Sequence, residues 1–385
     1  MASYTKLAKN NWQVVISLGY DANGKKKRIK KQGFKLKSDA EKFVTETLQK
    51  RNEGYLLIDN KVSFKQIFSE WYEHCKRPTL SIHSDDFYTR STNNHILPYF
   101  GTYRLNEINN LLVQKFYNNL IYNKNLKPST AKKIVGFLGV FFKYAKKQKL
   151  ILELPTDIEK VKYTNTKINC WNKEEVDFFL NKVKGSNIFR PVFIDLFTGL
   201  RIGELCGVRW CDIDLDKALL TVRNQAVYSS RDKKLFLIST LKTISSNRTI
   251  ILPQILVDYL YKIKEEEAPS PQDFIIVNKN YEMENPHCLS MRFSRAVRKF
   301  KDSFEEKKEK DPTINEEDYM QLNQISFHGL RHTHATLLLA YGENVKVVSE
   351  RLGHKSINIT LSTYTHVLNK MRTNSAKILD SIFEN

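Results

Sequence analysis

Side chains that can bind a phosphate or transfer a proton are concentrated in three stretches of the sequence. They are 198–205 (TGLRIGEL), 328–334 (HGLRHTH) and 352–366, which contains LGH and TYTH. Five of the nine histidines lie between residues 328 and 366. Guanidinium groups suit bidentate contact with a phosphate, and histidines suit proton transfer. A tyrosine hydroxyl, with a pKa of about 10, is a nucleophile if it loses its proton as it attacks. These types together indicate chemistry at a phosphate.

Other chemistries have weaker support. His328 and His332 are four residues apart and form a possible pair of metal ligands, but no glutamate lies between them as in HExxH. The sequence contains no Gly-x-Ser-x-Gly elbow, no Walker A motif and no glycine-rich dinucleotide fingerprint. We therefore expect no metal and no cofactor. We interpret His332, His334 and His366 as structural or incidental, and Cys206 and Cys211 as core residues.

The charge of the chain indicates a polyanionic partner. The 385 residues include 62 Lys and Arg against 42 Asp and Glu, a net charge of +20. Residues 1–60 have a net charge of +7 and residues 61–165 one of +9, which leaves +4 for the remaining 220 residues. Nucleic acid is the simplest such partner, held mainly by the N-terminal part. Scattered cysteines without a CxxC pair, and the lack of a signal peptide or a run of 18 apolar residues, indicate a reducing, intracellular compartment and no membrane partner.

The N-terminal part contains elements that can carry this charge. Residues 12–20 are strand-like, 21–24 form a turn signal, and a basic return strand follows, after which Ser38 starts a helix with a capping box. A small basic sheet with one helix is a plausible reader of a DNA groove. Helical periodicity then continues from residue 62 to about 154. Candidate DNA contacts are Lys25, Lys26, Lys27, Arg28 and Lys30 of the return strand, and Lys132, Lys133 and Lys143 of a long helix that starts at Pro128.

The third segment mixes helices with short strands. Strands are expected at 219–228, 235–239 and 248–252, in the order of a meander or hairpin. The polar run 302–323 indicates a mobile insertion, and residues 369–383 predict a terminal helix that docks on its own domain or on a neighbouring copy. We expect three domains, at 1–58, 62–155 and 170–385.

Taken together, these stretches resemble the tyrosine recombinase (phage integrase) family of DNA breaking and rejoining enzymes. TGLRIGEL resembles the family's first arginine box, HGLRHTHAT its His-x-x-Arg box, and LGHKSINITLSTYTHV its closing box with the nucleophilic tyrosine. The run LKTISSNRTI resembles the hairpin lysine region. Residues 62–154 resemble the helical core-binding domain more diffusely, and residues 12–52 resemble the arm-binding domain of integrases from phages and conjugative transposons.

The resemblance implies an α+β, mostly α, fold: a small arm-binding sheet with a helix, a helical core-binding domain and a mixed α/β catalytic domain. It also implies residue roles. Arg201 and Arg331 would clamp the scissile phosphate, and Tyr364 would attack it to give a 3′-phosphotyrosyl link. Lys242 would protonate the departing 5′ oxygen, and His328 and His354 would hold the phosphate and share proton transfer. Glu204 would orient the first arginine.

The function that follows is site-specific integration and excision of a phage or conjugative element. The implied partners are double-stranded DNA with core and arm attachment sites, further copies of the chain in a tetramer and an accessory directionality factor, in the cytoplasm of a bacterium and on its nucleoid when bound to DNA. A chromosome-dimer-resolving recombinase of the same family is the alternative, although the basic segment 1–55 argues against it. A further alternative is a non-catalytic DNA-binding protein on the same scaffold, which the intact motifs disfavour. Another is a type IB topoisomerase, which the arm-like domain and the compact size disfavour.

Overall fold

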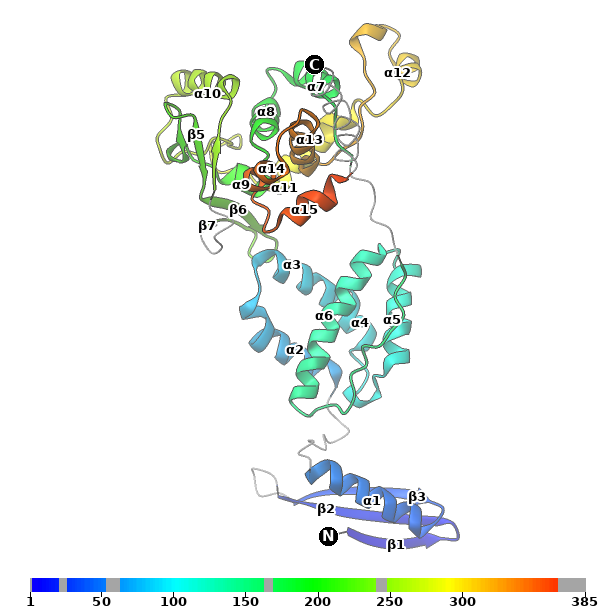
Figure 1. Ribbon diagram of the computed structural model, residues 1–385. Coiled ribbons are helices and arrows are strands. Elements are labelled where there is room, and N and C mark those ends of the chain that lie inside the picture. The colour runs from blue at the N-terminus through cyan, green and yellow to red at the C-terminus, as the bar shows by residue number, and fades with distance from the viewer. Residues whose placement is uncertain (1, 21–25, 53–62, 163–168, 240–247, 366–385) are drawn as a thin grey trace, which may run out of the picture. The chain divides into compact units, whose positions relative to one another are not determined.

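The computed structural model describes residues 2–20, 26–52, 63–162, 169–239 and 248–365. The chain divides into two compact units, residues 1–164 and 165–385, and each is described by itself. Both units combine helices with small antiparallel sheets, and most of the chain is helical (Figure 1). The α+β class expected from the sequence is confirmed. None of the helices in the described ranges is both long and apolar enough to span a bilayer.

The N-terminal part of the first unit is a three-stranded antiparallel sheet covered by one helix. Its elements are β1 (Ala2–Ala8), β2 (Asn11–Tyr20), β3 (Lys26–Phe34) and α1 (Lys37–Asn52), with strand order β1-β2-β3. The sequence predicts β2, β3 and the helix but not β1. Alternate residues of β2, Val14 and Ile16, are fully buried, and Ala40 and Val44 of α1 complete the same small core. The turn predicted at 21–24 lies outside the described residues.

The rest of the first unit is helical, as its periodicity predicts. Its core is rich in phenylalanine: Phe64 and Phe68 stack, and Phe141 packs edge-on against both, with ring centroids 5.0–5.3 Å apart. The elements are α2 (Phe64–Glu70), η1 (Trp71–Lys76), η2 (Arg77–Thr79), α3 (Ile82–Ser91), η3 (Thr92–Ile96), α4 (Leu97–Phe100), η4 (Leu105–Glu107), α5 (Asn110–Tyr122) and α6 (Pro128–Lys147).

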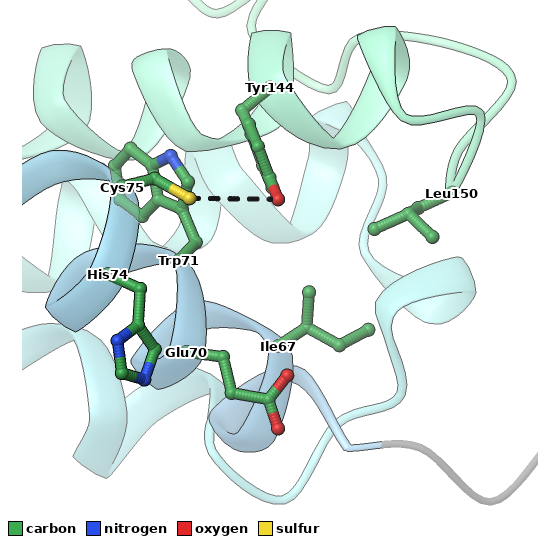
Figure 2. Close-up of a pocket in the computed structure, with 7 residues that line it drawn as sticks. All are labelled: Ile67, Glu70, Trp71, His74, Cys75, Tyr144 and Leu150. Atoms are coloured by element: carbon green, nitrogen blue, oxygen red, sulfur yellow. Dashed lines mark hydrogen bonds between the residues drawn. The ribbon is translucent and has the colours of Figure 1, made fainter.

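A pocket of about 450 Å³ opens between η1 and the end of α6 (Figure 2). The thiol of Cys75 lies 4.0 Å from the hydroxyl of Tyr144 across it. The pocket belongs to the helical part of the first unit and contains none of the predicted catalytic residues. Its lining residues are Ile67, Glu70, Trp71, His74, Cys75, Tyr144 and Leu150.

The second unit carries the three motif stretches. Its elements are α7 (Lys173–Val183), α8 (Phe189–Thr198), α9 (Ile202–Gly207), η5 (Trp210–Asp212), β4 (Ile213–Asp214), β5 (Leu219–Val222), β6 (Asn224–Ser229), β7 (Lys234–Ser239), β8 (Arg248–Ile251), α10 (Gln254–Glu267), α11 (Pro286–Arg298), α12 (Phe304–Lys310), η6 (Glu316–Asp318), α13 (Phe327–Ala340), α14 (Val345–Leu352) and α15 (Ile357–Thr363).

The strands of this unit differ from the expected meander. The strand predicted at 219–228 is divided at Arg223 into β5 and β6, which join different sheets. β6 and β7 form the hairpin, whereas β5 pairs with β8 and β4. A single run of strand-like residues does not reveal such a change of partner, because β5 and β6 have the same residue preferences.

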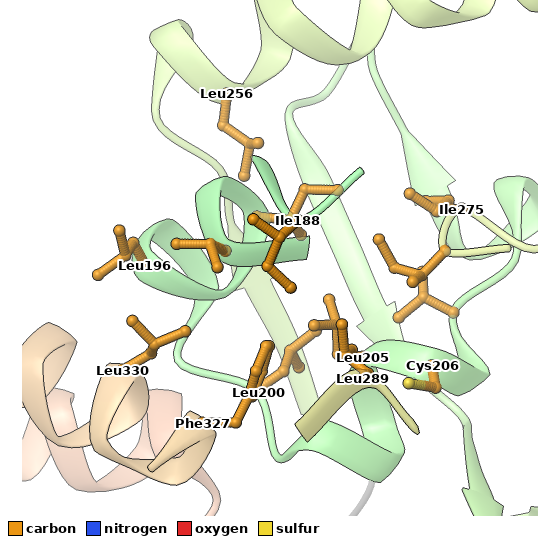
Figure 3. Packing of buried hydrophobic residues seen from close by; sticks show 14 of the residues in the cluster. Ile188, Leu196, Leu200, Leu205, Cys206, Leu256, Ile275, Leu289, Phe327 and Leu330 are labelled. Carbon is orange, nitrogen blue, oxygen red and sulfur yellow. The ribbon is translucent and has the colours of Figure 1, made fainter. Parts of the chain in front are cut away.

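One continuous apolar core joins these elements. Figure 3 shows Leu200 and Leu205, which flank Arg201, in the same cluster as Leu289 of α11 and Phe327 and Leu330 of α13. The polar run 302–323, which the sequence predicts to be a mobile insertion, is attached to this core at its end. The segment contains α12 and η6, and its end packs into the core through buried Leu322 and partly buried Met320.

Candidate active site

The first arginine box is built on a sharp end to α8. Gly199 ends the helix with φ of 62°, a left-handed conformation that favours glycine. A Cβ at this position would lie 2.6 Å from Cδ2 of His334, so the glycine also permits close packing against α13. The chain then turns into α9 with Arg201 at the N-cap. This local geometry places the Arg201 side chain beside the two other motif stretches.

Glu204 holds Arg201 in place. Its Oε2 accepts from the backbone N–H of Arg201 at 3.0 Å, and its Oε1 accepts from Nη1 of the same residue at 2.7 Å. Nη2 of Arg201 donates to the carbonyl of Gly353 at 3.1 Å, which ties the first box to the closing box. The Arg201 side chain nevertheless remains 42% exposed. It is thus oriented by the protein and still accessible to a ligand.

Arg248, the first residue of β8, forms a second ion pair with Glu204. Nη2 of Arg248 lies 2.8 Å from Oε2 of Glu204, and the two side chains are only 7% and 4% exposed. Nε of Arg248 donates to the carbonyl of Arg351 at 2.8 Å. Burial alone would raise the pKa of Glu204, but the hydrogen bond and charge of Arg248, together with Arg201, lower it to about 2. Glu204 therefore stays ionised between two arginines.

Arg331 is the buried arginine of the cluster and is only 2% exposed. Its Nη1 donates to the carbonyl of Gly199 at 2.7 Å, and its Nη2 donates to the carbonyl of Leu352 at 2.6 Å. Burial and the charge of Arg201 lower the pKa of Arg331 to about 10, so it stays charged at neutral pH. One guanidinium on α13 thus joins the backbone of the first box to that of the closing box.

A buried carboxyl group lies close enough to this arginine to interact with its charge. Asp195 of α8 is fully buried, and within the described ranges neither of its side-chain oxygens has a hydrogen-bond partner. Burial raises its pKa well above the usual range, even though the Arg331 charge acts in the opposite direction. No sequence pattern pointed to this group, because an aspartate in an apolar helix has no recognisable motif.

Two predicted histidines belong to the same cluster. Nδ1 of His354 lies 2.8 Å from the hydroxyl of Thr360, and burial together with the charges of Arg331 and Arg201 lowers the pKa of His354 to about 4. Desolvation and the Arg331 charge also lower the pKa of His328, although its side chain is exposed. The imidazole of His354 is therefore neutral at physiological pH.

Tyr364 follows the last turn of α15 and is 1% exposed. Its hydroxyl lies 2.8 Å from Nδ1 of His332. Burial raises the pKa of Tyr364, while the positive charge of Arg331 acts to lower it. The tyrosine hydroxyl is therefore within the electrostatic reach of Arg331.

The structure thus brings together six of the predicted site residues: Arg201, Glu204, His328, Arg331, His354 and Tyr364. Figure 1 shows the helices around them, α9, α13, α14 and α15, gathered in the second unit, with His354 in the connection between α14 and α15. Lys242 and His366 lie outside the described residues. Among the described residues, no group of three or more His, Cys, Asp or Glu side chains is placed to hold a metal ion.

The candidate DNA-contacting residues are on the surface where they are described. Arg28 and Lys30 are exposed on β3, and Lys132, Lys133 and Lys143 are exposed on α6. Lys26 and Lys27 belong to β3, and Lys25 lies outside the described residues. The cysteine interpretation is half wrong: Cys206 is buried, whereas Cys211 is exposed on the short 3-10 helix η5, whose other two residues, Trp210 and Asp212, face inward instead.

Sequence reasoning missed two further members of the cluster. Arg248 lies within the LKTISSNRTI run that was quoted for its lysine, and its spacing from Lys242 was the available signal. His332 follows Arg331 directly, and we interpreted it as structural or incidental. The structure adds that His332 contacts Tyr364, because helix α13 turns it toward the end of α15, 32 residues further along the chain.

Comparison with known proteins agrees with this fold and site. The phage integrase family pattern matches residues 186–371, an N-terminal SAM-like domain of phage integrases matches residues 63–121, and an arm DNA-binding domain matches residues 2–50. A "Tyrosine recombinase XerC-like" protein of Caldanaerobacter subterraneus is 26% identical over 99% of this chain and 98% of its own length. The ICEBs1 integrase of Bacillus subtilis is 24% identical over 99% of this chain and 100% of its own.

Solved structures show the same fold. The Tn1549 transposon integrase, in complex with transposon right-end DNA, superposes with a TM-score of 0.67 at 20% identity and covers 84% of this chain and 100% of its own. A lambda integrase tetramer bound to a Holliday junction gives 0.55 at 17% identity, covering 92% and 95%. Fold and site define an enzyme that breaks and rejoins DNA strands. The chain belongs to the phage integrase family of tyrosine recombinases.

Proposed function

We propose that Arg201, Arg331 and Tyr364 carry out the strand cleavage that defines this family, with Tyr364 as the nucleophile. The observation that carries the proposal is the coupling of these residues in one cluster: Arg331 is bonded to Gly199 and Leu352, Arg201 to Gly353, and the Tyr364 hydroxyl experiences the Arg331 charge. The two guanidiniums clamp the scissile phosphate and stabilise the negative charge that develops on it.

The remaining predicted residues complete the reaction. Tyr364 forms a 3′-phosphotyrosyl link, and Lys242, which lies outside the described residues, protonates the departing 5′ oxygen. His328 and His354 contact the phosphate and share proton transfer, and both have a lowered pKa. Glu204 acts through Arg201, which it orients with two hydrogen bonds.

We further propose that three domains share the work: residues 1–58 bind arm sites, 62–155 bind the core site and 170–385 catalyse. The charge supports this division, because 16 of the 20 excess positive charges belong to residues 1–165. On the surface of β3, Arg28 and Lys30 are exposed cations suited to phosphate contacts, and Lys132, Lys133 and Lys143 play the same part on α6.

The element served is a phage or conjugative element, which the protein integrates and excises as a tetramer on DNA. Relatives support this: the ICEBs1 integrase matches this chain over its full length, and the integrase of Staphylococcus phage L54a is 25% identical over 86% of this chain. A directionality factor and a terminal helix at 369–383 that packs on a neighbouring copy belong to the same proposal, as does a cytoplasmic location with the protein on the nucleoid when bound to DNA. Residues 369–383 lie outside the described residues.

The decisive experiment uses a nicked duplex that carries the core attachment sequence of the encoding element. Wild-type protein should become covalently linked to the DNA, whereas Tyr364→Phe should bind the duplex without forming the adduct. Tyr341→Phe is a matched control, since Tyr341 is 77% exposed on the same unit, and it should form the adduct normally. A covalent adduct with Tyr364→Phe would disprove the assignment of the nucleophile.

Removal of residues 1–55 distinguishes an integrase from a chromosome-dimer-resolving recombinase. The truncated chain should still cleave a single core site but lose most integration between paired attachment sites. Equal loss of both activities would contradict a separate arm-binding role.

A further inference from the structure

We infer that His332 is a catalytic residue that accepts the proton of the Tyr364 hydroxyl as the tyrosine attacks DNA. The inference rests on the proposed role of Tyr364 as the nucleophile and adds a step that this role leaves open. A phenol attacks phosphorus only as it loses its proton, and therefore a proton acceptor at the hydroxyl is required.

The geometry selects His332 for this task. Its Nδ1 lies 2.8 Å from the Tyr364 hydroxyl, within the distance that direct proton transfer needs. Nδ1 of His354, by contrast, is engaged by the Thr360 hydroxyl at 2.8 Å. The motif comparison gives His332 no role. Its ring nevertheless contacts the rings of His328 and Tyr364, which both have a role in the reaction.

The His332 ring is also held in one orientation. It packs edge-on against His328, with centroids 4.7 Å apart and an interplanar angle of 86°, and its centroid is 5.8 Å from that of Tyr364. His332 is half-buried, and His328, Arg331, His354 and Tyr364 are the titratable or charged groups that face it. Desolvation and the charges of His328 and Arg331 lower the pKa of His332 to about 4, so the ring is neutral and able to accept a proton.

The step balances as follows. In the tautomer with its proton on Nε2, His332 receives the tyrosine proton on Nδ1 while the phenolic oxygen bonds to phosphorus. The bond from phosphorus to the 5′ oxygen breaks, and that oxygen takes a proton from Lys242. In rejoining, the 5′-hydroxyl attacks phosphorus and gives its proton back to Lys242, the bond from phosphorus to the tyrosine oxygen breaks, and His332 returns its proton to Tyr364.

The test compares His332→Asn and His332→Gln with wild type in single-turnover cleavage of the nicked core-site duplex. Both variants should bind the duplex as wild type does and cleave it about 100-fold more slowly, the usual contribution of a general base. His287→Asn, an exposed histidine of α11, is the matched control for loss of an imidazole. Full cleavage rates in both His332 variants would overturn the inference.

Two readouts separate a proton acceptor from a residue that only shapes the site. Between pH 6 and 9 the cleavage rate of the variants should rise about tenfold per pH unit, because Tyr364 must then lose its proton to hydroxide, whereas the wild-type rate should change less. A duplex with sulfur in place of the 5′ bridging oxygen needs no proton on its leaving group. It should therefore rescue Lys242→Ala but not His332→Asn.

Parallel pH profiles, or rescue of both variants by the sulfur substrate, would rule out proton transfer to His332. Failure of the proposed function gives a different result, because wild type would then form no adduct, or Tyr364→Phe would form one.

Discussion

Arg248 and Glu204 form an almost fully buried ion pair, with 2.8 Å between Nη2 and Oε2, and the same carboxylate orients Arg201. One glutamate thus links β8 to the N-terminus of α9. A buried charge whose partner is removed is costly, since the remaining ion is left uncompensated in a medium of low dielectric constant.

Replacing Arg248 should therefore destabilise the catalytic unit and displace Arg201. We expect Arg248→Met to lower the free energy of unfolding by about 3–5 kcal/mol, the usual cost of breaking a buried pair. Denaturant unfolding checks this, with Lys173→Met as control, because Lys173 and Asp177 pair at 2.5 Å with both side chains more than half exposed. That control should change stability by less than about 1 kcal/mol. Similar losses for the two variants would contradict a special role for the buried pair.

The same pair predicts how stability depends on pH. The pKa of Glu204 is about 2 in the folded protein and about 4.3 when unfolded. Its contribution, about 3 kcal/mol from that difference, is complete above pH 4.3 and is lost as pH falls toward 2. Thermal unfolding of wild type and Glu204→Gln should therefore differ most at neutral pH and converge below pH 4. A difference that is constant across this range would contradict the low pKa of Glu204.

Arg331 should not tolerate lysine. A single ammonium group cannot reproduce the two divergent bonds to the carbonyls of Gly199 and Leu352 while it also faces a phosphate. We expect Arg331→Lys to reduce cleavage of the nicked duplex about 100- to 1,000-fold, as for loss of a donor to a developing oxyanion. Single-turnover rates measured at saturating protein check this. Cleavage within tenfold of wild type would show that the bidentate geometry is dispensable.

Replacing Asp195 by asparagine should make the protein more stable than wild type at pH 7. Because its pKa is raised in the folded state, the carboxyl contributes stability below its unfolded pKa of about 3.9, and that contribution is lost as pH rises through the folded pKa. Asp195→Asn should therefore raise the melting temperature at pH 7 and give no gain near pH 4. Asp258→Asn, at an exposed carboxylate of α10, should show neither effect. A lower melting temperature for Asp195→Asn at pH 7 would mean that the carboxylate is ionised and paired with Arg331.

Alanine should destabilise the protein more at Gly199 than at Gly185. Both have positive φ, 62° and 78°, but a Cβ at Gly199 meets His334, whereas nothing lies within 4 Å at Gly185. Alanine at either position carries a backbone cost of about 1–2 kcal/mol. Gly199→Ala should cost about 1–3 kcal/mol more, the usual price of overpacking. Equal losses in urea unfolding would show that His334 moves aside freely.

The sequence predicted the site better than its surroundings. Arg201, His328, Arg331, His354 and Tyr364 stand in motifs whose types and order are specific, and the structure brings them into one cluster. His332 and Arg248 were missed because their roles depend on partners 32 and 44 residues away along the chain, which only the fold brings near. Asp195 was missed for a similar reason, since its importance comes from burial rather than from its residue type.

The same limit applies to the fold. The helices of the first unit follow from their apolar periodicity, and α6 begins at Pro128 as expected. The division of the predicted strand at Arg223 depends on which strand pairs with which, and local preferences do not carry that information. The end of the 302–323 run packs into the core through Leu322 and Met320, two of the few apolar residues in a polar stretch, and composition alone obscures them.

The bonds from Arg331 to the carbonyls of Gly199 and Leu352 cannot all form before Leu352 has been synthesised. Both carbonyls and every other described member of the cluster precede Tyr364 in the chain, so the ribosome adds the nucleophile after the phosphate clamp and its supports. A nascent chain that has reached Leu352 contains the parts of the clamp but has nothing with which to cut.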